Sequence, residues 1–342
     1  MSTLPLNVAL VGFGFAGQTF HAPLISACPD LRLHTVVTSK PDVLSAAWPE
    51  AKPVAGLDDA LADPAIDLVV IATPDAVHAA QAEQALKAGK AVVVDKPFAR
   101  SRADAARLVD LAREKGLLLS VFHNRRWDAD FLALQAEIAA GGLGHVVAYE
   151  SRFDRYRPVV RDRWREAAGA GIWFDLGPHL IDQALVLFGR PQAITLDLAI
   201  QREGGLSPDR AQATLRYDQT RVILTASVLV AAPDVRFAVH GSEASFLSSG
   251  LDVQEDQLKA GMTVGGPGWG VCGHPPIRVE GETGQRTPIT GAAGNYPAYY
   301  AGVAAAVRGL GPNPVPPKQA LAVMEVLEAG IESDRLRREV AL

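Results

Sequence analysis

The chain has 342 residues, 48% of them hydrophobic and 21% charged, with a formal net charge of −5 at pH 7. This length exceeds what one hydrophobic core usually serves, so two domains are expected. The acidic balance, without a basic run, argues against nucleic-acid binding. The apolar runs are strand-length, far below the roughly 20 residues of a spanning helix, and the N-terminus does not resemble a signal peptide, so we expect a cytoplasmic location without membrane attachment.

The two cysteines, Cys28 and Cys272, do not form a C-x-x-C pair. This usage argues against a disulfide framework and against structural zinc. His274 lies close to Cys272 in the sequence, but two candidate ligands in a glycine-rich stretch do not make a metal site. We therefore expect no metal.

A predicted strand at residues 7–11 runs directly into a glycine-rich turn with the spacing of a dinucleotide-binding fingerprint. In this pattern Gly12 allows the tight turn, Gly14 lets the backbone approach a pyrophosphate, and Gly17 lets the following helix pack closely. The phosphates are then expected at a helix N-terminus. The alternative is a glycine-rich turn without a ligand. The residues predicted to contact the cofactor here are Gly12, Phe13, Gly14, Phe15 and Gly17.

Up to residue 121, short β-rich runs alternate with helical patterns, which indicates a parallel sheet with crossover helices. Predicted helices at residues 76–88 and 102–115 end at Gly89 and Gly116, where a left-handed C-cap is favoured. Pro23 falls inside the expected first helix, so that helix should be short, kinked, or restarted with Pro23 in its first turn. The predicted strands are residues 7–11, 33–37, a short one near Val54, 68–72, 91–94 and 117–121.

After residue 121 the apolar residues follow a period of two, which predicts strands with one covered face in an open, largely antiparallel sheet. Predicted helices cover one face of this sheet, and the other face is a natural subunit interface for a homodimer or homotetramer. Residues 265–276 are expected to form a glycine-rich surface loop. The predicted strands are 146–153, 194–200, 211–217, 221–230 and 235–240, and the predicted helices are 128–140, 178–188, 297–308 and 319–335.

The loop after the second strand bears on the choice of cofactor. An acidic residue at this place, about 20 residues after the fingerprint, is the usual device for binding the ribose of NAD. Here Asp30 precedes the strand and Asp42 follows Lys40-Pro41, so neither carboxylate lies at the strand end. Ser39 and Lys40 instead offer a donor and a positive charge suited to a 2′-phosphate, which favours NADP over NAD.

Lys96 follows the predicted strand 91–94, between Asp95 and Pro97. The carboxyl edge of an open α/β sheet is where such folds bind ligands. The proline restricts Lys96 to an extended backbone and allows a cis peptide bond. A functional lysine is therefore predicted here; the alternative is a solvated surface lysine before an ordinary turn.

A second candidate site includes Asp175 and His179. Pro178 is predicted as the first residue of a helix, which places His179 in the first turn, where the helix dipole disfavours an imidazolium ion. A neutral imidazole can accept a proton, and Asp175 could fix its tautomer. The alternative reading is a capping Asp175 and a packed surface His179.

Several motifs together resemble the Gfo/Idh/MocA family of oxidoreductases. These are the glycine fingerprint, Ala72-Thr73-Pro74 with His78, Asp95-Lys96-Pro97, and Asp175 with His179 and Asp182. Longer runs are similar to the bacterial scyllo-inositol dehydrogenase branch of that family. They include residues 122–128 with Asn124, residues 161–166 with Arg163 and Trp164, and residues 294–300 with Tyr296.

The resemblance implies a Rossmann domain that binds NAD(P) over residues 1–123, and an α/β domain for substrate binding and oligomerisation over residues 124–342. By position it implies that Lys96, Asp175 and His179 are catalytic and contact the substrate. Asp95 stands where the family usually has glutamate. Further cofactor contacts are implied at Thr73, Pro74, His78, Asp95, Lys96 and Asn124. Pocket walls are implied at Arg163, Trp164 and Tyr296, with ordinary packing as the alternative.

The function expected from this resemblance is hydride transfer between a nicotinamide and a secondary alcohol or ketone of a cyclic polyol or sugar, with an inositol as first candidate. His179 would take the hydroxyl proton while Lys96 stabilises alkoxide character, and which of the two holds the proton is left open. A reductase of aldose or keto-sugar derivatives is the alternative enzyme. An NAD(P)-binding regulator or sensor is the alternative from another class.

Overall fold

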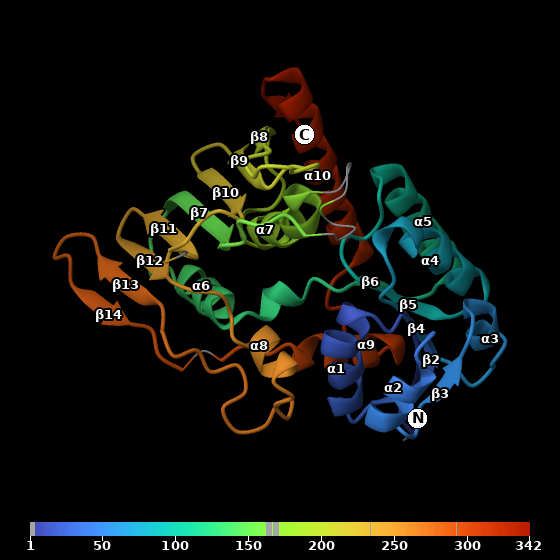
Figure 1. Ribbon diagram of the computed structural model, residues 1–342. Helices are drawn as coiled ribbons and strands as arrows, with labels where there is room; N and C mark the ends of the chain where they lie inside the picture. Colours follow the sequence, from blue (N-terminus) through green and yellow to red (C-terminus); the bar gives the residue numbers. More distant parts are fainter. Residues whose placement is uncertain (1–3, 162–165, 167–170, 233, 292) are drawn as a thin grey trace. The chain divides into compact units, whose positions relative to one another are not determined.

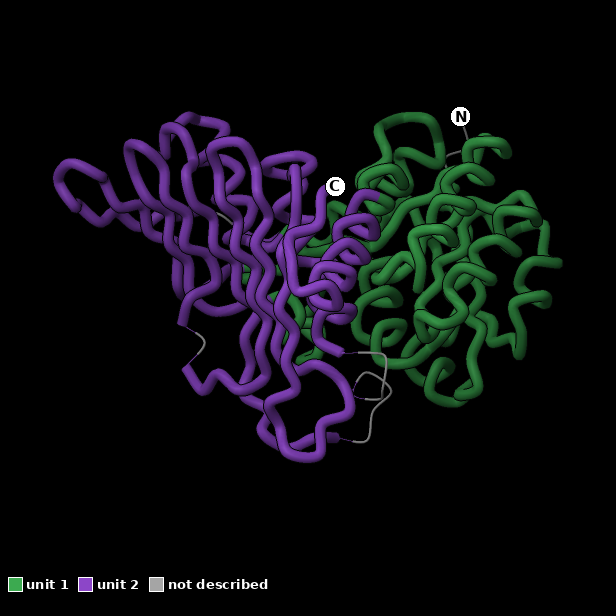
Figure 2. Tube along the Cα trace, turned by 90° about the horizontal axis from the view of Figure 1, so that it is seen from above, with its two compact units in different colours: residues 1–127, 254–270, 295–321 green, residues 128–253, 271–294, 322–342 purple. Residues whose placement is uncertain are grey.

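A computed structural model describes residues 4–161, 166, 171–232, 234–291 and 293–342 (Figure 1). The chain divides into two compact units, each made of three segments (Figure 2). The first unit contains residues 1–127, 254–270 and 295–321, and the second contains residues 128–253, 271–294 and 322–342. The domain boundary at residue 123 stays a prediction from the sequence.

The first unit is built on a six-stranded parallel sheet with the order β3-β2-β1-β4-β5-β6. Every residue of β4 and β5 is buried, as expected for strands covered on both faces. The strand order reverses between β1 and β4, the place where open α/β sheets bind ligands. The strands are β1 (Leu6–Val11), β2 (Leu31–Val37), β3 (Lys52–Val54), β4 (Leu68–Ile71), β5 (Ala91–Val94) and β6 (Leu119–Val121).

The helices of this unit include α5, which is capped at both ends, with the predicted glycine at its C-terminus. The Ser101 hydroxyl accepts a hydrogen bond from the backbone N–H of Asp104, and Gly116 ends the helix with a φ of 64°. The α-helices are α1 (Ala22–Ala27), α2 (Pro41–Ala47), α3 (Leu57–Leu61), α4 (His78–Lys87), α5 (Arg102–Lys115), α8 (Gln254–Lys259) and α9 (Pro297–Val307). Two 3-10 turns are η2 (Asp75–Val77) and η3 (Asn124–Trp127).

The first helical segment changes form where the sequence contains Pro23. A π-helical turn, η1 (Gly17–His21), is followed at once by α1, whose first turn contains Pro23. The N–H of Ala22 donates to the carbonyl oxygen of Gly17, so the backbone stays helical from η1 into α1. Of the predicted features, the position of Pro23 in the first turn of an α-helical segment is found, but the segment continues from a π-helical turn.

The second unit is built on a nine-stranded sheet with the order β14-β13-β12-β11-β7-β10-β9-β8-β15. The described neighbours pair antiparallel except β7 with β10, so the predicted, largely antiparallel sheet is confirmed. The strands are β7 (Val146–Asp154), β8 (Ala193–Ala199), β9 (Arg210–Arg216), β10 (Arg221–Ser227), β11 (Phe237–Gly241), β12 (Ala244–Ser248), β13 (Ile277–Glu280), β14 (Arg286–Pro288) and β15 (Val340–Ala341).

The two faces of this sheet differ in polarity. Along β9, Ala211, Ala213 and Leu215 are fully buried, whereas Arg210, at the start of the strand, forms an ion pair of 3.3 Å with Asp197. Helix α7 (Ile172–Phe188) packs on β7, β9 and β10. The remaining helices are α6 (Ala129–Ala139) and α10 (Pro317–Leu336), whose residues from 322 onward belong to this unit. Use of the polar face as a subunit interface stays a prediction.

Residues 265–276 contain only turns, bends and one isolated bridge, as predicted for a loop. Within the described part of the chain, no helix is both long enough and apolar enough to cross a membrane.

Candidate active site

The glycine-rich turn after β1 has the geometry that its spacing predicts. Gly12 has a φ of +98°, and a Cβ there would lie 2.7 Å from the carbonyl oxygen of Ala72. A Cβ on Gly17 would collide with the carbonyl group of Gly12. Around Gly14, by contrast, a Cβ would meet no atom within 4 Å. Gly12 is therefore needed for the turn and Gly17 for close packing, whereas the backbone at Gly14 is open to a ligand.

The two phenylalanines of this turn lie in different surroundings. Phe13 is buried, and its ring contacts that of Trp48 edge to face at 5.7 Å. Phe15 is 55% exposed and contacts Phe20, also edge to face, at 6.0 Å. Phe13 therefore packs into the unit, and Phe15 presents an aromatic surface beside the open turn.

The loop after β2 is exposed at Ser39 and Lys40, next to the end of β1 in the sheet. The backbone N–H of Lys40 donates to the Thr38 hydroxyl at 2.9 Å, which fixes the turn into α2. A hydroxyl and a cationic side chain are thus held at the carboxyl edge, where a ribose of a bound dinucleotide is expected. Their contact with a cofactor stays a prediction.

His78 connects the loops that follow β4 and β5. Its ring is 1% exposed. Its Nδ1 lies 2.9 Å from the carbonyl oxygen of Pro97, and its Nε2 lies 2.9 Å from that of Thr73. Thr73 in turn donates its hydroxyl hydrogen bond to Gln81, whereas Pro74 is exposed. His78 therefore holds together the two loops that contain Thr73 and Lys96.

Lys96 comes directly after β5, at the carboxyl edge of the parallel sheet. The backbone N–H of Asp95 donates to the carbonyl oxygen of Ile71 at 2.8 Å, which extends the β4–β5 pairing by one residue. The backbone N–H of Lys96 donates to Asp95 Oδ1 at 2.8 Å, and the Lys96–Pro97 peptide bond is cis. The side chain of Lys96 therefore starts from a backbone N–H that is held by Asp95.

Behind Lys96, Asp95 faces His21, which in turn contacts Tyr300, and sequence reasoning missed both side chains. His21 is fully buried; its Nε2 lies 3.7 Å from Asp95 Oδ1, and its Nδ1 lies 2.6 Å from the Tyr300 hydroxyl oxygen. Burial acts to raise the pKa of Asp95, but the nearby His21 and the charge of Lys96 outweigh it and lower that pKa. The sequence signal that could have identified His21 is its position two residues before Pro23, where the first helix was expected to change.

In the second unit, α7 places Asp175 and His179 four residues apart, on one face of the helix. The prediction that α7 begins at Pro178 is wrong, because the chain turns at Gly171, with a φ of 107°, and the helix starts at Ile172. His179 is therefore two turns into the helix, so the dipole argument does not apply to it. Asp175, predicted upstream, lies in the first turn.

The His179 ring is 6% exposed and stacks on Phe153 at 6.1 Å, with an angle of 23° between the rings. One turn further along α7, Gln183 accepts a hydrogen bond of 2.6 Å from Arg236. The buried Arg236 also donates to the Ser151 hydroxyl at 2.6 Å, and its guanidinium lies over the Phe153 ring at 5.6 Å. Sequence reasoning missed Arg236, which supports both neighbours of His179.

The other predicted residues are distributed as follows. Tyr296 is fully buried, and its hydroxyl accepts a hydrogen bond of 3.1 Å from Arg125. Asn124 is 4% exposed at the start of η3. Arg163 and Trp164 lie outside the described residues. Lys96 and the glycine turn belong to the first unit, and Asp175 and His179 belong to the second.

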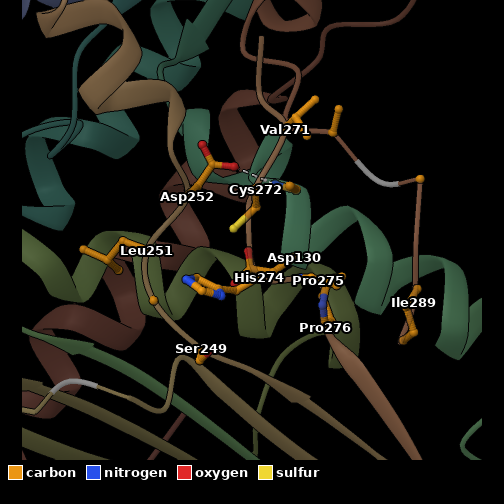
Figure 3. A pocket seen from close by; sticks show the side chains of 14 residues that line it. Asp130, Ser249, Leu251, Asp252, Val271, Cys272, His274, Pro275, Pro276 and Ile289 are labelled. Atoms are coloured by element: carbon orange, nitrogen blue, oxygen red, sulfur yellow. Dashed lines mark hydrogen bonds between the residues drawn. The ribbon is translucent and has the colours of Figure 1, made fainter. Parts of the chain in front are cut away.

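A cavity of about 150 Å³ lies in the second unit (Figure 3). Asp130, Asp252, Cys272 and His274 are among its lining residues, and none of the predicted site residues lines it. Burial, and then the charge of Asp252, raises the pKa of Asp130 against the opposing charge of Arg236. Within the described ranges, no group of three or more His, Cys, Asp or Glu side chains is arranged to hold a metal ion.

Comparison with known proteins gives full-length relatives. The chain is 48% identical to the uncharacterized oxidoreductase YdgJ of Escherichia coli, covering 98% of this chain and 99% of YdgJ. It is 35% identical to scyllo-inositol 2-dehydrogenase (NADP(+)) IolW of Bacillus subtilis, covering 98% of this chain and 96% of IolW. The solved structure of YPO2259 from Yersinia pestis superposes with a TM-score of 0.96 at 47% identity, covering 99% of this chain and 98% of that one.

Two domains of one protein family match consecutive parts of the chain. The NAD-binding Rossmann fold of the oxidoreductase family matches residues 6–123, and the C-terminal alpha/beta domain of the same family matches residues 135–342. With its parallel first sheet, its largely antiparallel second sheet and these matches, the chain belongs to the Gfo/Idh/MocA oxidoreductases and has an NAD(P)-binding Rossmann domain.

Proposed function

We propose that the protein is an NADP-dependent dehydrogenase that oxidises a secondary alcohol of a cyclic polyol or sugar, with scyllo-inositol as the first substrate to test. The observation that carries the proposal is Lys96, held by its backbone at the carboxyl edge of a dinucleotide-binding sheet. The full-length similarity to a relative named as an NADP-dependent scyllo-inositol dehydrogenase supports the choice of substrate and cofactor.

The residues of the first unit fit a dinucleotide. The open space at Gly14 admits a pyrophosphate close to the backbone, whereas Gly12 and Gly17 are required by the turn itself. Ser39 and Lys40 are exposed at the end of β2, where they would bind a 2′-phosphate. This donor and cation, in a loop that lacks a carboxylate, support NADP over NAD.

The chemistry proposed for this chain needs two groups at the reacting oxygen. When bound, the nicotinamide exchanges a hydride with the carbinol carbon. Lys96 donates a hydrogen bond to the substrate oxygen and stabilises its alkoxide character, and His179 takes the hydroxyl proton. Asp175, on the same helical face as His179, orients the imidazole or the substrate. Contacts of Thr73, Asn124 and Tyr296 with cofactor or substrate are part of the same proposal.

The test follows the absorbance of reduced nicotinamide with the purified protein and a panel of scyllo-inositol, myo-inositol, common aldoses and the matching inososes. We expect turnover of an inositol, with a higher kcat/KM for NADP than for NAD. Turnover of an aldose or keto-sugar derivative alone would show that the substrate is such a derivative and not an inositol. Silence across the panel while NADPH still binds would contradict the enzyme proposal and favour a sensor. A higher kcat/KM for NAD would overturn the cofactor preference.

A further inference from the structure

Two buried side chains and the partly buried Asp95 form a line that ends at the backbone of Lys96. The Tyr300 hydroxyl lies 2.6 Å from His21 Nδ1, His21 Nε2 lies 3.7 Å from Asp95 Oδ1, and that same Oδ1 accepts the backbone N–H of Lys96 at 2.8 Å. His21 and Tyr300 are both 0% exposed, and all four residues belong to the first unit. Side chains from η1 and α9 thus converge behind the loop that carries Lys96.

The contacts on the two sides of His21 favour one tautomer. An N–H at Nε2 faces the Asp95 carboxylate, so Nδ1 is taken as the acceptor and the Tyr300 hydroxyl as its donor. Burial, and then the charges of Tyr299 and Asp95, raises the pKa of Tyr300 well above its usual value. A neutral imidazole that accepts at Nδ1 carries its own proton at Nε2. Nε2 is the nitrogen that faces Asp95, and this buried atom has no hydrogen-bond partner within the described chain.

Asp95 is the acceptor on which both sides converge. A buried carboxylate is stable only when donors or positive charge compensate its lost hydration. Here the compensation comes from His21 and from Lys96. The 3.7 Å separation between His21 Nε2 and Asp95 Oδ1 is longer than a hydrogen bond, so His21 acts on the carboxylate as a nearby polar group.

Aromatic packing limits the freedom of this line. The His21 ring lies 4.5 Å from that of Phe122, and the Tyr300 ring contacts Phe122 at 5.9 Å and Tyr299 at 5.3 Å. His21 also ends the π-helical turn that begins at Gly17, the last glycine of the fingerprint. One short segment therefore shapes the proposed cofactor turn and supports the lysine loop, and π-helical turns are frequent at functional sites.

We propose that His21 and Tyr300 are positioning residues that hold Lys96 in its reacting orientation, acting through Asp95. The catalytic consequence rests on the proposed function, whereas the effect on the Lys96 backbone does not. Tyr300 fixes the His21 tautomer, His21 fixes the Asp95 carboxylate, and Asp95 fixes the Lys96 N–H.

The test compares Tyr300→Phe, His21→Leu and His21→Gln with the matched control Tyr299→Phe. The control removes a buried hydroxyl from the adjacent residue, whose partner is Ser120 rather than His21. Amide hydrogen exchange of the segment that contains Asp95 and Lys96 is measured by mass spectrometry on the full chain, with Tm and the Kd for NADPH recorded for each variant.

We expect faster exchange of this segment in Tyr300→Phe and His21→Leu, and parental exchange in Tyr299→Phe. His21→Gln, which keeps a polar N–H group at this position, should lie between His21→Leu and the parent. On an inositol substrate kcat should fall roughly tenfold to a hundredfold in Tyr300→Phe, with KM within about twofold of the parent, because a misplaced group loses rate more than binding.

Unchanged exchange at Lys96 in a folded Tyr300→Phe protein would overturn the proposal, whatever the activity. Equal loss of exchange protection in Tyr299→Phe would overturn it as well, because the effect would then be general loosening of the core. If His21→Leu does not fold, Tyr300→Phe decides the question. If the variants exchange faster but the parent protein is inactive on the whole panel, the positioning of Lys96 by His21 and Tyr300 stands and the proposed function is rejected.

Discussion

His78 illustrates how much a single side chain determines in the first unit. Its two ring nitrogens each lie 2.9 Å from a backbone carbonyl oxygen, one in the loop after β4 and one in the loop after β5. A neutral imidazole can donate to only one of them at a time, whereas an imidazolium ion donates to both. His78 therefore links the loops of Thr73 and Lys96 through backbone atoms, which a motif match cannot reveal.

The position of Lys96 could be predicted from its neighbours in the sequence. His21 and Tyr300, which support it, could not be predicted because they are distant from it in the sequence. Lys96 follows a buried strand and precedes a proline, so its place at the sheet edge could be predicted from neighbouring residues. Tyr300 is 279 residues from His21. No local sequence pattern predicts the contact between them, because η1 and α9 come together only in the folded unit.

Asp130 gives a prediction that concerns one carboxyl group. Its Oδ2 accepts a hydrogen bond from Ser248, whereas the buried Oδ1 has no hydrogen-bond partner among the described residues. Burial raises its pKa in the fold, so this carboxyl favours the folded state below its unfolded pKa, and that stability is lost as the pH rises through the folded pKa. Asp130→Asn should therefore raise Tm by about 2 °C near pH 8 and give no gain near pH 4.

Thermal unfolding of parent and variant at the two pH values checks this expectation. Asp110→Asn is the matched control, since Asp110 is 67% exposed and pairs with Arg113, which is 75% exposed. It should change Tm little at either pH. A lower Tm of Asp130→Asn near pH 8 would show that the ionised carboxylate stabilises the fold.

Helix α7 shows which element boundary the sequence could not supply. Pro178 favours a helix start, and an N-terminal proline was the reasonable prediction from local rules. The actual start depends on Gly171, whose φ of 107° turns the chain, and on Ile172, whose N–H donates to the Pro208 carbonyl at 2.8 Å. Burial of Ile172, Trp173 and Leu176 then stabilises two extra turns, despite the hydrogen bond that Pro178 cannot make.

The glycine turn provides a matched pair of substitutions at the scale of an element. In Gly14→Ala the added Cβ meets no atom within 4 Å, so Tm should remain close to that of the parent. Its methyl group would occupy the space through which the pyrophosphate approaches, so Kd for NADPH should rise about tenfold or more. In Gly12→Ala the φ of +98° and the contact with the Ala72 carbonyl should lower Tm by several degrees as well.

Isothermal titration with NADPH and thermal unfolding measure the two effects separately. Parental NADPH affinity in Gly14→Ala would contradict the assignment of this turn to the cofactor. Parental Tm in Gly12→Ala would contradict the packing argument for the turn alone.

For the whole molecule, strand periodicity was sufficient to predict a parallel sheet followed by a largely antiparallel one. The segments that complete each unit could not be predicted in this way. Gln254, fully buried, donates to the carbonyl oxygen of Trp127 and accepts from the Tyr296 N–H and the Trp269 indole N–H. One amide thus joins three distant segments of the first unit, through polar contacts that have no periodic signature in the sequence.

In the proposed function, Lys96 acts on the substrate oxygen in an NADP-dependent oxidation of a cyclic polyol. The most direct measurement is kcat of Lys96→Ala with scyllo-inositol and NADP, together with the NADPH Kd of the same variant. We predict that kcat falls at least about a hundredfold while the Kd stays near that of the parent, because the lost group acts on the reacting oxygen. Turnover close to that of the parent, with the cofactor still bound, would contradict the account.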